Sequence, residues 1–453
     1  MSAAAHQSEL TLPEVAESNV LLRQDLPVHS WYRFVLSYPP HLVRKYAAAF
    51  DLGPDSLLLD PFCGTGTTLV EAKKLGIPSV GCDAHPFAVL VSQAKTNWSL
   101  PISKLREKAR RIAKLALEEM ENCELPVDSF SARLMEEPIA PPWRKWSLGE
   151  DENKVMPLGF VSERPLARLL ILRHFIEQET KRQSDGVEAF FNVALAHVIA
   201  NGAGNFAFGP EIYRTREKFD YDVLDHFIGR VTSMCDDLER IEPNLAGTPA
   251  AASQDDARLL SNVPEGISAV ITSPPYPNEK DYTRTTRVES LLLRFMFDRE
   301  SLRQVKTHLL RSNTRNVFVA DADGDEVAEF KSIQSVCRQI EDRRIELNKT
   351  SGFERLYHKV VAHYFGGMRL HLRALKPKLR RRARLAYVVG DQLSFLMVPV
   401  ATAKLLAEVA EAEGYRVLGI DLWRERVGTK VRNGLNGEKL VRVREEVLLL
   451  EKK

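Results

Sequence analysis

The sequence has few cysteines and no long hydrophobic run. Its five cysteines are scattered, with no Cys-x-x-Cys pair and no histidine at ligand spacing, so neither a disulfide framework nor a zinc site is expected, and no metal is predicted. No apolar stretch is long enough to cross a bilayer, so no membrane span is expected. The first residues lack the basic start and the apolar segment of a signal peptide, and we therefore expect a cytoplasmic protein.

The chain also carries little net charge. Among its 453 residues, 63 Lys+Arg and 61 Asp+Glu nearly cancel and leave a formal net charge of +2. A charge this small does not by itself indicate nucleic-acid binding, so a DNA surface has to come from local clusters. The densest basic cluster spans residues 376–384. It is interpreted either as a phosphate-binding segment or as a solvated loop before the next strand.

Two motifs far apart in the chain each follow an apolar, strand-like run. The first is Asp-Pro-Phe-Cys-Gly-Thr-Gly-Thr-Thr at residues 60–68, after the run at 57–59. The second is Thr-Ser-Pro-Pro-Tyr at residues 272–276, after the run at 269–271. Because ligands of open α/β sheets bind at the carboxyl ends of parallel strands, we expect both motifs at the binding edge of one sheet.

The first motif is a glycine-rich turn. Gly64 and Gly66 allow the backbone to turn sharply and to approach a ligand, and Asp60 supplies a carboxylate that suits a cationic ligand. The third glycine of a dinucleotide fingerprint and the lysine of a P-loop are both missing, which disfavours a nucleotide phosphate. Asp83 ends the next strand, about 20 residues further on, where an acid either accepts hydrogen bonds from ribose hydroxyls or caps the following helix.

In the second motif each position suits a mechanical role. Pro274 and Pro275 fix φ and lack donors, so the carbonyl of Pro274 is a rigid acceptor beside the hydroxyl of Ser273. Two such acceptors suit an amino group that must be held in one orientation. Tyr276 supplies a ring that can stack on a planar ligand. The alternative interpretation is a proline-rich turn with a core tyrosine.

Together the motifs resemble the cofactor and catalytic loops of the amino-methyltransferases that modify exocyclic nitrogens of DNA bases, in particular bacterial site-specific enzymes of the cytosine-N4 type. The resemblance covers roughly residues 29–98 and 250–300, with a looser match over 385–450. Ser273 leads the tetrapeptide in the cytosine group, whereas adenine-N6 enzymes more often carry Asp or Asn there. This chain departs from the commonest layout of the group, because its cofactor loop comes first.

The resemblance implies a class I methyltransferase fold: an α/β, Rossmann-like, mostly parallel seven-stranded sheet with an antiparallel edge hairpin and two helical insertions. It implies S-adenosyl-L-methionine as cofactor, double-stranded DNA as substrate, and direct in-line transfer after base flipping. A cognate restriction endonuclease is the partner that such a system implies, and the oligomeric state is not indicated. The implied catalytic residues are Ser273, Pro274, Pro275 and Tyr276. The implied cofactor-binding residues are Tyr38, Asp60, Pro61, Phe62, Cys63, Gly64, Gly66, Thr67, Thr68, Asp83, Ala84 and Asp256, the last being either a contact to the adenine amino group or an ordinary surface acid.

The pattern along the chain predicts five segments. They are the cofactor-binding half of the core (20–100), a helical insertion that is the candidate target-recognition region (101–248), the catalytic-loop part of the core (249–295), a second helical insertion (296–375) and the C-terminal strands of the core (376–453). Within the first insertion strand signals disappear, and Ser103 is the expected helix N-cap. The aromatic segment at residues 205–214, and Arg311, Asn313 and Arg315 in the second insertion, suit either base contacts or structural loops.

Three other functions are left open. An adenine-N6 DNA methyltransferase would use the same machinery. tRNA guanine-amino methyltransferases carry a similar cofactor loop, but an RNA-binding module usually precedes it, and fewer than about 60 residues do so here. An inactive, DNA-binding regulatory or defence protein is the third alternative, although both motifs are intact.

Overall fold

A computed structural model describes residues 21–126, 140–181, 186–209, 211–278, 280–432 and 438–453. Its centre is a seven-stranded sheet with the order β5-β2-β1-β6-β7-β9-β8. The strands of the sheet are β1 (Leu58–Asp60), β2 (Ser79–Asp83), β5 (Ala250–Gln254), β6 (Ile267–Thr272), β7 (Leu379–Gly390), β8 (Tyr415–Arg432) and β9 (Glu438–Lys452).

Five neighbouring strands, from β5 to β7, are parallel, and β9 lies antiparallel between β7 and β8. The predicted class I methyltransferase fold, with its antiparallel hairpin at one edge of the sheet, is confirmed. The hairpin strands are longer than the runs at 415–422 and 441–450 that periodicity indicates.

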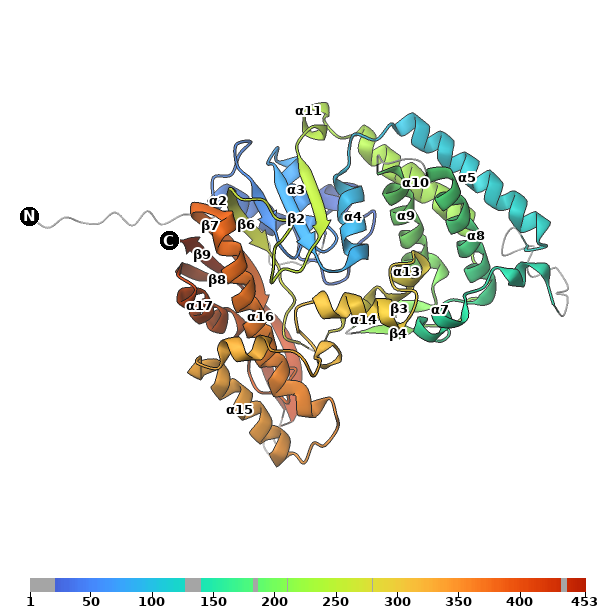
Figure 1. Cartoon of the computed structure of the whole chain (residues 1–453). Coiled ribbons are helices and arrows are strands. Elements are labelled where there is room, and N and C mark those ends of the chain that lie inside the picture. The colour runs from blue at the N-terminus through green and yellow to red at the C-terminus, as the bar shows by residue number, and fades with distance from the viewer. Residues whose placement is uncertain (1–20, 127–139, 182–185, 210, 279, 433–437) are drawn as a thin grey trace, which may run out of the picture.

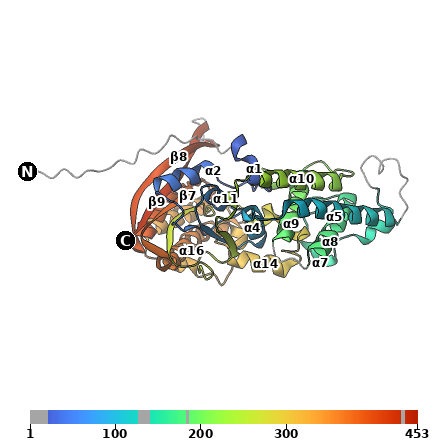
Figure 2. The ribbon, with the colours of Figure 1, turned by 90° about the horizontal axis from the view of Figure 1, so that it is seen from above.

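The molecule is elongated, with the sheet near one end and a helical lobe at the other (Figure 1). Seen from above, the long strands β8 and β9 curve along the end opposite the lobe (Figure 2). The helices are α1 (Leu26–His29), α2 (Pro40–Ala49), α3 (Thr67–Lys74), α4 (Pro86–Thr96), α5 (Ile102–Asn122), α7 (Glu150–Val155), α8 (Glu163–Thr180), α9 (Val187–Val198), α10 (Val223–Glu239), α11 (Pro243–Ala246), α12 (Tyr282–Thr285), α13 (Arg287–Leu292), α14 (Arg299–His308), α15 (Lys331–Glu346), α16 (Tyr357–Lys378) and α17 (Thr402–Ala412).

The two faces of the sheet are covered by different helices, because side chains alternate along each strand. On β6, Ala269 and Ile271 face a core that includes α2, whereas Val270 between them faces the core formed with α15, α16 and α17. Because both cores are buried, the sequences of these strands are nearly continuous apolar runs.

The segment boundary predicted at residue 376 falls in the last turn of α16, and this helix packs on the sheet.

The helical lobe has its own apolar core, built from α5, α8, α9 and α10. Val70 of α3 and Phe87 of α4 belong to the same cluster, so the lobe is continuous with the helices that flank the sheet. The expectation that it lacks strands is wrong, because β3 (Phe206–Phe208) and β4 (Ile212–Arg214) form an antiparallel pair within it. Among the residues that the structure describes, no helix has both the length and the apolar character to cross a membrane.

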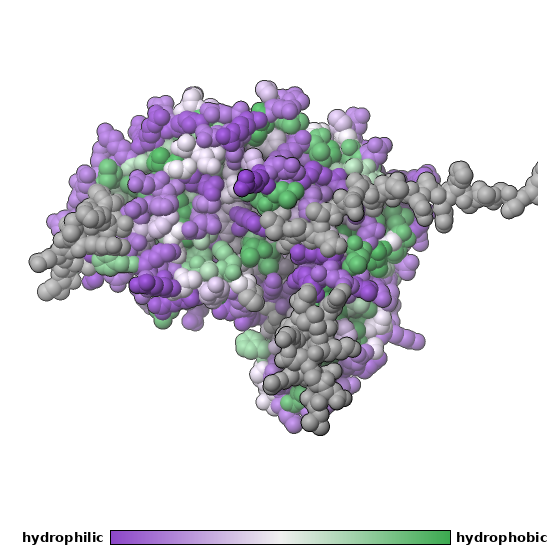
Figure 3. Space-filling view, turned by 180° about the vertical axis from the view of Figure 1, so that it is seen from behind, coloured by the Kyte–Doolittle hydropathy of each residue, from purple (hydrophilic) through white to green (hydrophobic). Residues whose placement is uncertain are grey.

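Two local expectations are corrected by the structure. The helix predicted to start at Ser103 begins at Ile102 with Pro101 at its N-cap, where the fixed φ of proline suits the first turn. The basic cluster at 376–384 is not a loop, because it forms the end of α16 and the start of β7. From behind, hydrophilic side chains cover most of the surface and hydrophobic ones are scattered among them (Figure 3).

Candidate active site

Both sequence motifs line one cavity of about 320 Å³ at the carboxyl ends of β1, β2 and β6. Gly64 lines it from the first motif and Pro274 from the second. The other predicted site residues that line it are Tyr38, Pro61, Phe62, Cys63, Thr67, Asp83, Ala84, Ser273, Pro275 and Tyr276. The structure thus brings together residues that are far apart in the chain, as the sheet-edge argument predicts.

The glycine-rich turn has the backbone that its sequence requires. Gly64 and Gly66 have φ values of +49° and +87°, a conformation that side chains rarely adopt. A Cβ at Gly66 would also lie 2.9 Å from Oγ of Ser92 on α4, whereas beside Gly64 the space is open for 4 Å. The turn therefore packs tightly against α4 on one side and leaves the cavity free at Gly64.

Asp60 lies beneath the turn and links the two motifs. It is 1% exposed, and its carboxylate accepts hydrogen bonds from the Thr272 hydroxyl at 2.6 Å and from the Phe62 amide at 3.1 Å. The Thr68 hydroxyl donates to the same carboxylate and contacts the Tyr38 hydroxyl. Burial raises the pKa of Asp60 to about 6. Asp60 and Thr68 are not among the residues that line the cavity, and a direct contact from either to a ligand stays a prediction.

Asp83 lies between the glycine-rich turn and the start of α4, and a contact from it to ribose hydroxyls stays a prediction. One carboxylate oxygen accepts from the Gly64 amide at 3.0 Å, and the other accepts from the His85 amide at 2.8 Å, at the start of α4. A carboxylate has about four lone-pair sites, so these two hydrogen bonds do not exhaust the acceptor capacity of Asp83, which lines the cavity. Burial raises the pKa of Asp83 to about 6.

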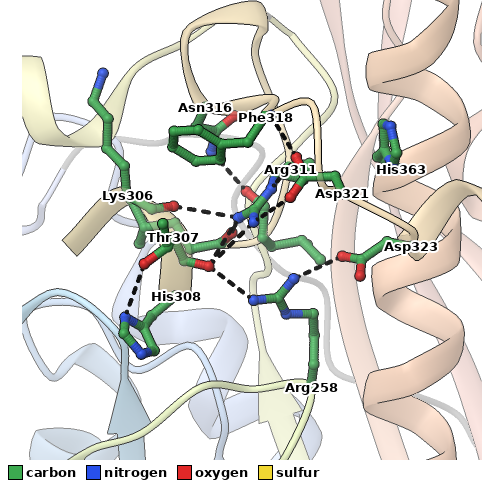
Figure 4. A network of polar contacts seen from close by, with 12 residues as sticks. Arg258, Lys306, Thr307, His308, Arg311, Asn316, Phe318, Asp321, Asp323 and His363 are labelled. Carbon is green, nitrogen blue, oxygen red and sulfur yellow. Dashed lines mark hydrogen bonds and ion pairs between the residues drawn. The ribbon is translucent and has the colours of Figure 1, made fainter. Parts of the chain in front are cut away.

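The structure places Asp256 in an ion pair. Its carboxylate contacts Arg258 at 2.6 Å, while the next residue, Ala257, lines the cavity. Arg258 also pairs with Asp323 at 2.8 Å and donates to the Thr307 carbonyl at 3.0 Å (Figure 4). The contact of Asp256 to a cofactor stays a prediction.

Arg311 lies at the centre of the same polar network (Figure 4). It is 3% exposed, and its guanidinium makes two hydrogen bonds of 2.8 Å to Asp321 and two of 3.2 Å to the Thr307 carbonyl. Asn313 is also buried and donates to the carbonyl of Lys280 at 3.0 Å. Neither side chain lines the cavity, and their burial and hydrogen bonds favour the structural one of the two predicted roles.

The residues of the Ser-Pro-Pro-Tyr loop contact the neighbouring strand β7. The hydroxyl of Ser273 donates to the carbonyl of Val388 at 3.2 Å. The ring of Tyr276 lies against Gly390, where a Cβ would be 3.0 Å from Cε2 of the ring. Because both contacts are made by β7, the loop and the strand form one rigid wall.

Sequence reasoning missed the side chains that β8 and β9 contribute to the cavity. They are Trp423, Arg424, Arg426 and Glu445. Glu445 is 4% exposed and pairs with the Nε atoms of both arginines. No short motif marks these residues, and the available signal is an alternation of charged residues within strands that otherwise belong to a core.

The β3–β4 pair of the helical lobe also reaches the cavity, which Gly209 lines. Next to it, Glu211 pairs with Arg315 at 2.8 Å and with Arg284, which lies in α12 shortly after the catalytic loop. Residues 205–214 therefore connect the lobe to the catalytic loop and to the second insertion, and base contacts by this segment stay a prediction.

Comparisons with known proteins agree with this arrangement. Residues 27–94 match the family model described as DNA methylase. The chain is similar to the type II methyltransferase M.BsoBI of Geobacillus stearothermophilus, with 23% identity over 303 residues, which are 64% of this chain and 57% of that protein. The resemblance to bacterial site-specific DNA methyltransferases is thereby confirmed.

A second similarity is shorter. The type II methyltransferase M.MjaII of Methanocaldococcus jannaschii is 35% identical over 81 residues, which are 18% of this chain and 15% of that protein. The matched regions thus span about half or less of the length of these relatives. The match to the DNA methylase model includes the glycine-rich loop and Asp83 but ends before the catalytic loop.

Proposed function

We propose that the chain is an S-adenosylmethionine-dependent DNA methyltransferase that modifies the N4 amino group of cytosine within a specific sequence. The observation that carries this proposal is the shared cavity, in which the glycine-rich loop and the Ser-Pro-Pro-Tyr loop meet. The hydrogen bond from Thr272 to Asp60 ties the two loops together. Similarity to two type II methyltransferases supports DNA as the substrate.

The residues around the glycine-rich loop fit the proposed cofactor. Asp83 offers free acceptor sites for ribose hydroxyls, Gly64 leaves open space for close approach, and Phe62 and Ala84 add apolar surface for a nucleoside. S-adenosylmethionine, when bound, supplies an electrophilic methyl group on a sulfonium sulfur. Tyr38, Cys63 and Thr67 line the same part of the cavity.

The catalytic loop fits the task of orienting an amino group. The Ser273 hydroxyl donates to the carbonyl of Val388 and also hydrogen-bonds with the Tyr276 side chain. One lone pair of its oxygen remains to accept from the substrate nitrogen. The Pro274 carbonyl is the second acceptor, and together the two hold the nitrogen in line with the methyl group. Once the cofactor had supplied its methyl group, the substrate nitrogen would release one proton to water. Tyr276 stacks on the extruded base.

The test is methylation by the purified protein with a labelled methyl donor. Plasmid DNA is incubated, digested to nucleosides and separated, and N4-methylcytosine is the expected product. Recovery of N6-methyladenine alone would defeat the cytosine assignment and keep the amino-methyltransferase activity. Label in tRNA and none in DNA would instead favour the RNA-directed alternative.

Sequencing a host genome for modified bases, with and without the gene, identifies the recognition sequence. A single sequence that is modified only in the presence of the gene is expected.

A further inference from the structure

The part of the cavity beyond Tyr276 is formed by three adjacent strands. Gly390 of β7 is the register partner of Glu445 on β9, and Glu445 is the register partner of Arg424 on β8. Directly opposite residues in a sheet place their side chains on the same face. Gly390 has no side chain, and the Tyr276 ring lies in that position. Glu445 and Arg424 therefore continue outward from Tyr276 along one face.

Arg426 joins this row from two positions further along β8, on the same face of the strand. Glu445 pairs with its Nε at 2.9 Å and also with Nε of Arg424. The carboxylate thus contacts both arginines through Nε, and each guanidinium group carries further N–H donors on its terminal amino groups. We call Arg424, Arg426 and Glu445 the arginine wall, and all three line the cavity.

The arginine wall is rich in donors. Guanidinium groups only donate hydrogen bonds, and the nearby Lys280, which also lines the cavity, does the same. Burial and the positive charge of Arg426 lower the pKa of Lys280. This part of the cavity thus has three cationic side chains and one carboxylate, Glu445, and it favours a ligand whose facing edge carries hydrogen-bond acceptors.

Bases with an exocyclic amino group differ in what lies next to that group. In cytosine the amino group is followed by two acceptors, N3 and O2. In adenine it is followed by one acceptor, N1, and then by a carbon-bound hydrogen that no donor can use. A base whose amino group lies at Ser273 would project its next atoms from β6 toward β9, a span of about 10 Å for two strand spacings. That span accommodates a pyrimidine ring and the end of an arginine side chain.

We propose that the arginine wall, through Arg426 and Arg424 fixed by Glu445, recognises the N3 and O2 edge of the extruded cytosine and selects cytosine over adenine. This inference rests on the proposed function and adds to it the residues that determine the target base. Ser273 and Pro274 recognise the amino group that both bases share, so discrimination requires contacts further along the ring.

The test measures how well the variant Arg426→Met discriminates between cytosine and adenine as the target base. Arg426 suits it because its side chain is 40% exposed, so its loss leaves the more buried pair of Arg424 and Glu445 intact. Duplexes carry the recognition sequence with either cytosine or adenine at the target position, and kcat/KM is measured for both. We expect the ratio of cytosine to adenine to fall about 10- to 100-fold, as is typical for loss of a good side chain to base contact.

Arg444→Met is the matched control. Arg444 precedes Glu445 on β9, so it faces the opposite side of the strand, and its side chain is 53% exposed. Its substitution should leave the ratio unchanged. A duplex with 3-deazacytosine, in which N3 is replaced by a carbon–hydrogen group, should be a poor substrate for the wild type and no worse for Arg426→Met.

The outcomes separate this inference from the proposed function. If Arg426→Met lowers kcat/KM equally for all duplexes, the arginine contacts the nucleic-acid backbone and the inference is wrong. If the wild type methylates only adenine, the inference falls while the amino-methyltransferase activity stands. If the wild type incorporates no labelled methyl group into DNA, the proposed function itself is wrong, and this is known before any variant is compared.

Discussion

The ring of Tyr276 lies directly on the backbone of Gly390, at the place where any other residue would have a side chain. A Cβ added at Gly390 would be 3.0 Å from Cε2 and 3.3 Å from Cδ2 of that ring. We therefore expect Gly390→Ala to displace Tyr276 and to lower kcat about 10-fold or more, since small misplacements of reacting groups are costly. Single-turnover methylation measures the effect, and calorimetry should show unchanged cofactor affinity.

A matched control for Gly390→Ala is Gly419→Ala. Gly419 lies in β8 of the same sheet, and a Cβ there would meet no atom within 4 Å. Both substitutions remove one strand glycine, but only the first should reduce the methylation rate. Equal rates for the two variants would show that the Tyr276 ring does not need its present position.

Ser273→Ala and Tyr276→Ala should both reduce turnover strongly while cofactor binding survives. The first removes an acceptor from the amino group, and the second removes a stacking surface worth about 1–3 kcal/mol for each base. Tyr276→Phe keeps the ring and removes the hydroxyl that hydrogen-bonds with Ser273, so it should lose much less turnover than Tyr276→Ala. Normal methylation by both alanine variants would show that the catalytic assignment is wrong.

Cofactor affinity should depend on pH through Asp83. Burial raises its pKa to about 6, and only the ionised carboxylate offers all of its acceptor sites to ribose hydroxyls. Cofactor affinity should therefore be highest above about pH 7 and should fall as the pH drops through 6. Well below pH 6 the affinity should fall about tenfold for each pH unit. Calorimetric titration between pH 5 and 8 measures this.

Asp83→Asn identifies the group responsible for that pH dependence. The variant should bind the cofactor weakly and with little change between pH 5 and 8. The pKa of Asp60 is also raised to about 6 by burial, so a pH dependence that persisted in Asp83→Asn would assign the titration to Asp60.

Glu211→Gln should strengthen DNA binding. Glu211 pairs with Arg284 and Arg315 near the catalytic loop, and the substitution releases both arginines from that carboxylate. Each cation that then contacts a phosphate should steepen the dependence of log K on log salt by about 0.9. Fluorescence anisotropy at several salt concentrations measures the slope.

The control for the salt slope is Glu217→Gln. Glu217 pairs with Arg214 at 3.2 Å close to the same strand pair, but both of these side chains are more exposed. Its substitution removes the same charge and should change the slope less. A weaker affinity of Glu211→Gln for DNA would mean that the carboxylate organises the site and does not compete with phosphate.

The parts of the site that local sequence predicts are those in which strand, turn and helix follow one another. The glycine-rich turn and Asp83 belong to one βαβ unit, so a segment of about 25 residues is enough to predict that they lie side by side. The Ser-Pro-Pro-Tyr loop is predictable beside them because parallel strands end at the same edge of the sheet, and both motifs line one cavity.

The remaining parts depend on contacts between distant segments. The pairing of Glu445 with Arg424 follows from the register of β8 and β9, which spacing in the sequence does not reveal. Arginine is a residue type that often contacts nucleic acids, but Arg311 is buried in an ion pair with Asp321, which favours a structural role. The β3–β4 strands have only three residues each, too few for a periodic signal.

The position of β9 has a consequence for the order in which the site is completed during synthesis. β8 leaves the ribosome before β9, yet it joins the sheet only through β9, which lies between it and β7. A nascent chain that has not yet exposed β9 therefore has the glycine-rich turn and the Ser-Pro-Pro-Tyr loop but lacks one wall of the cavity. Translation itself delays the appearance of a complete pocket.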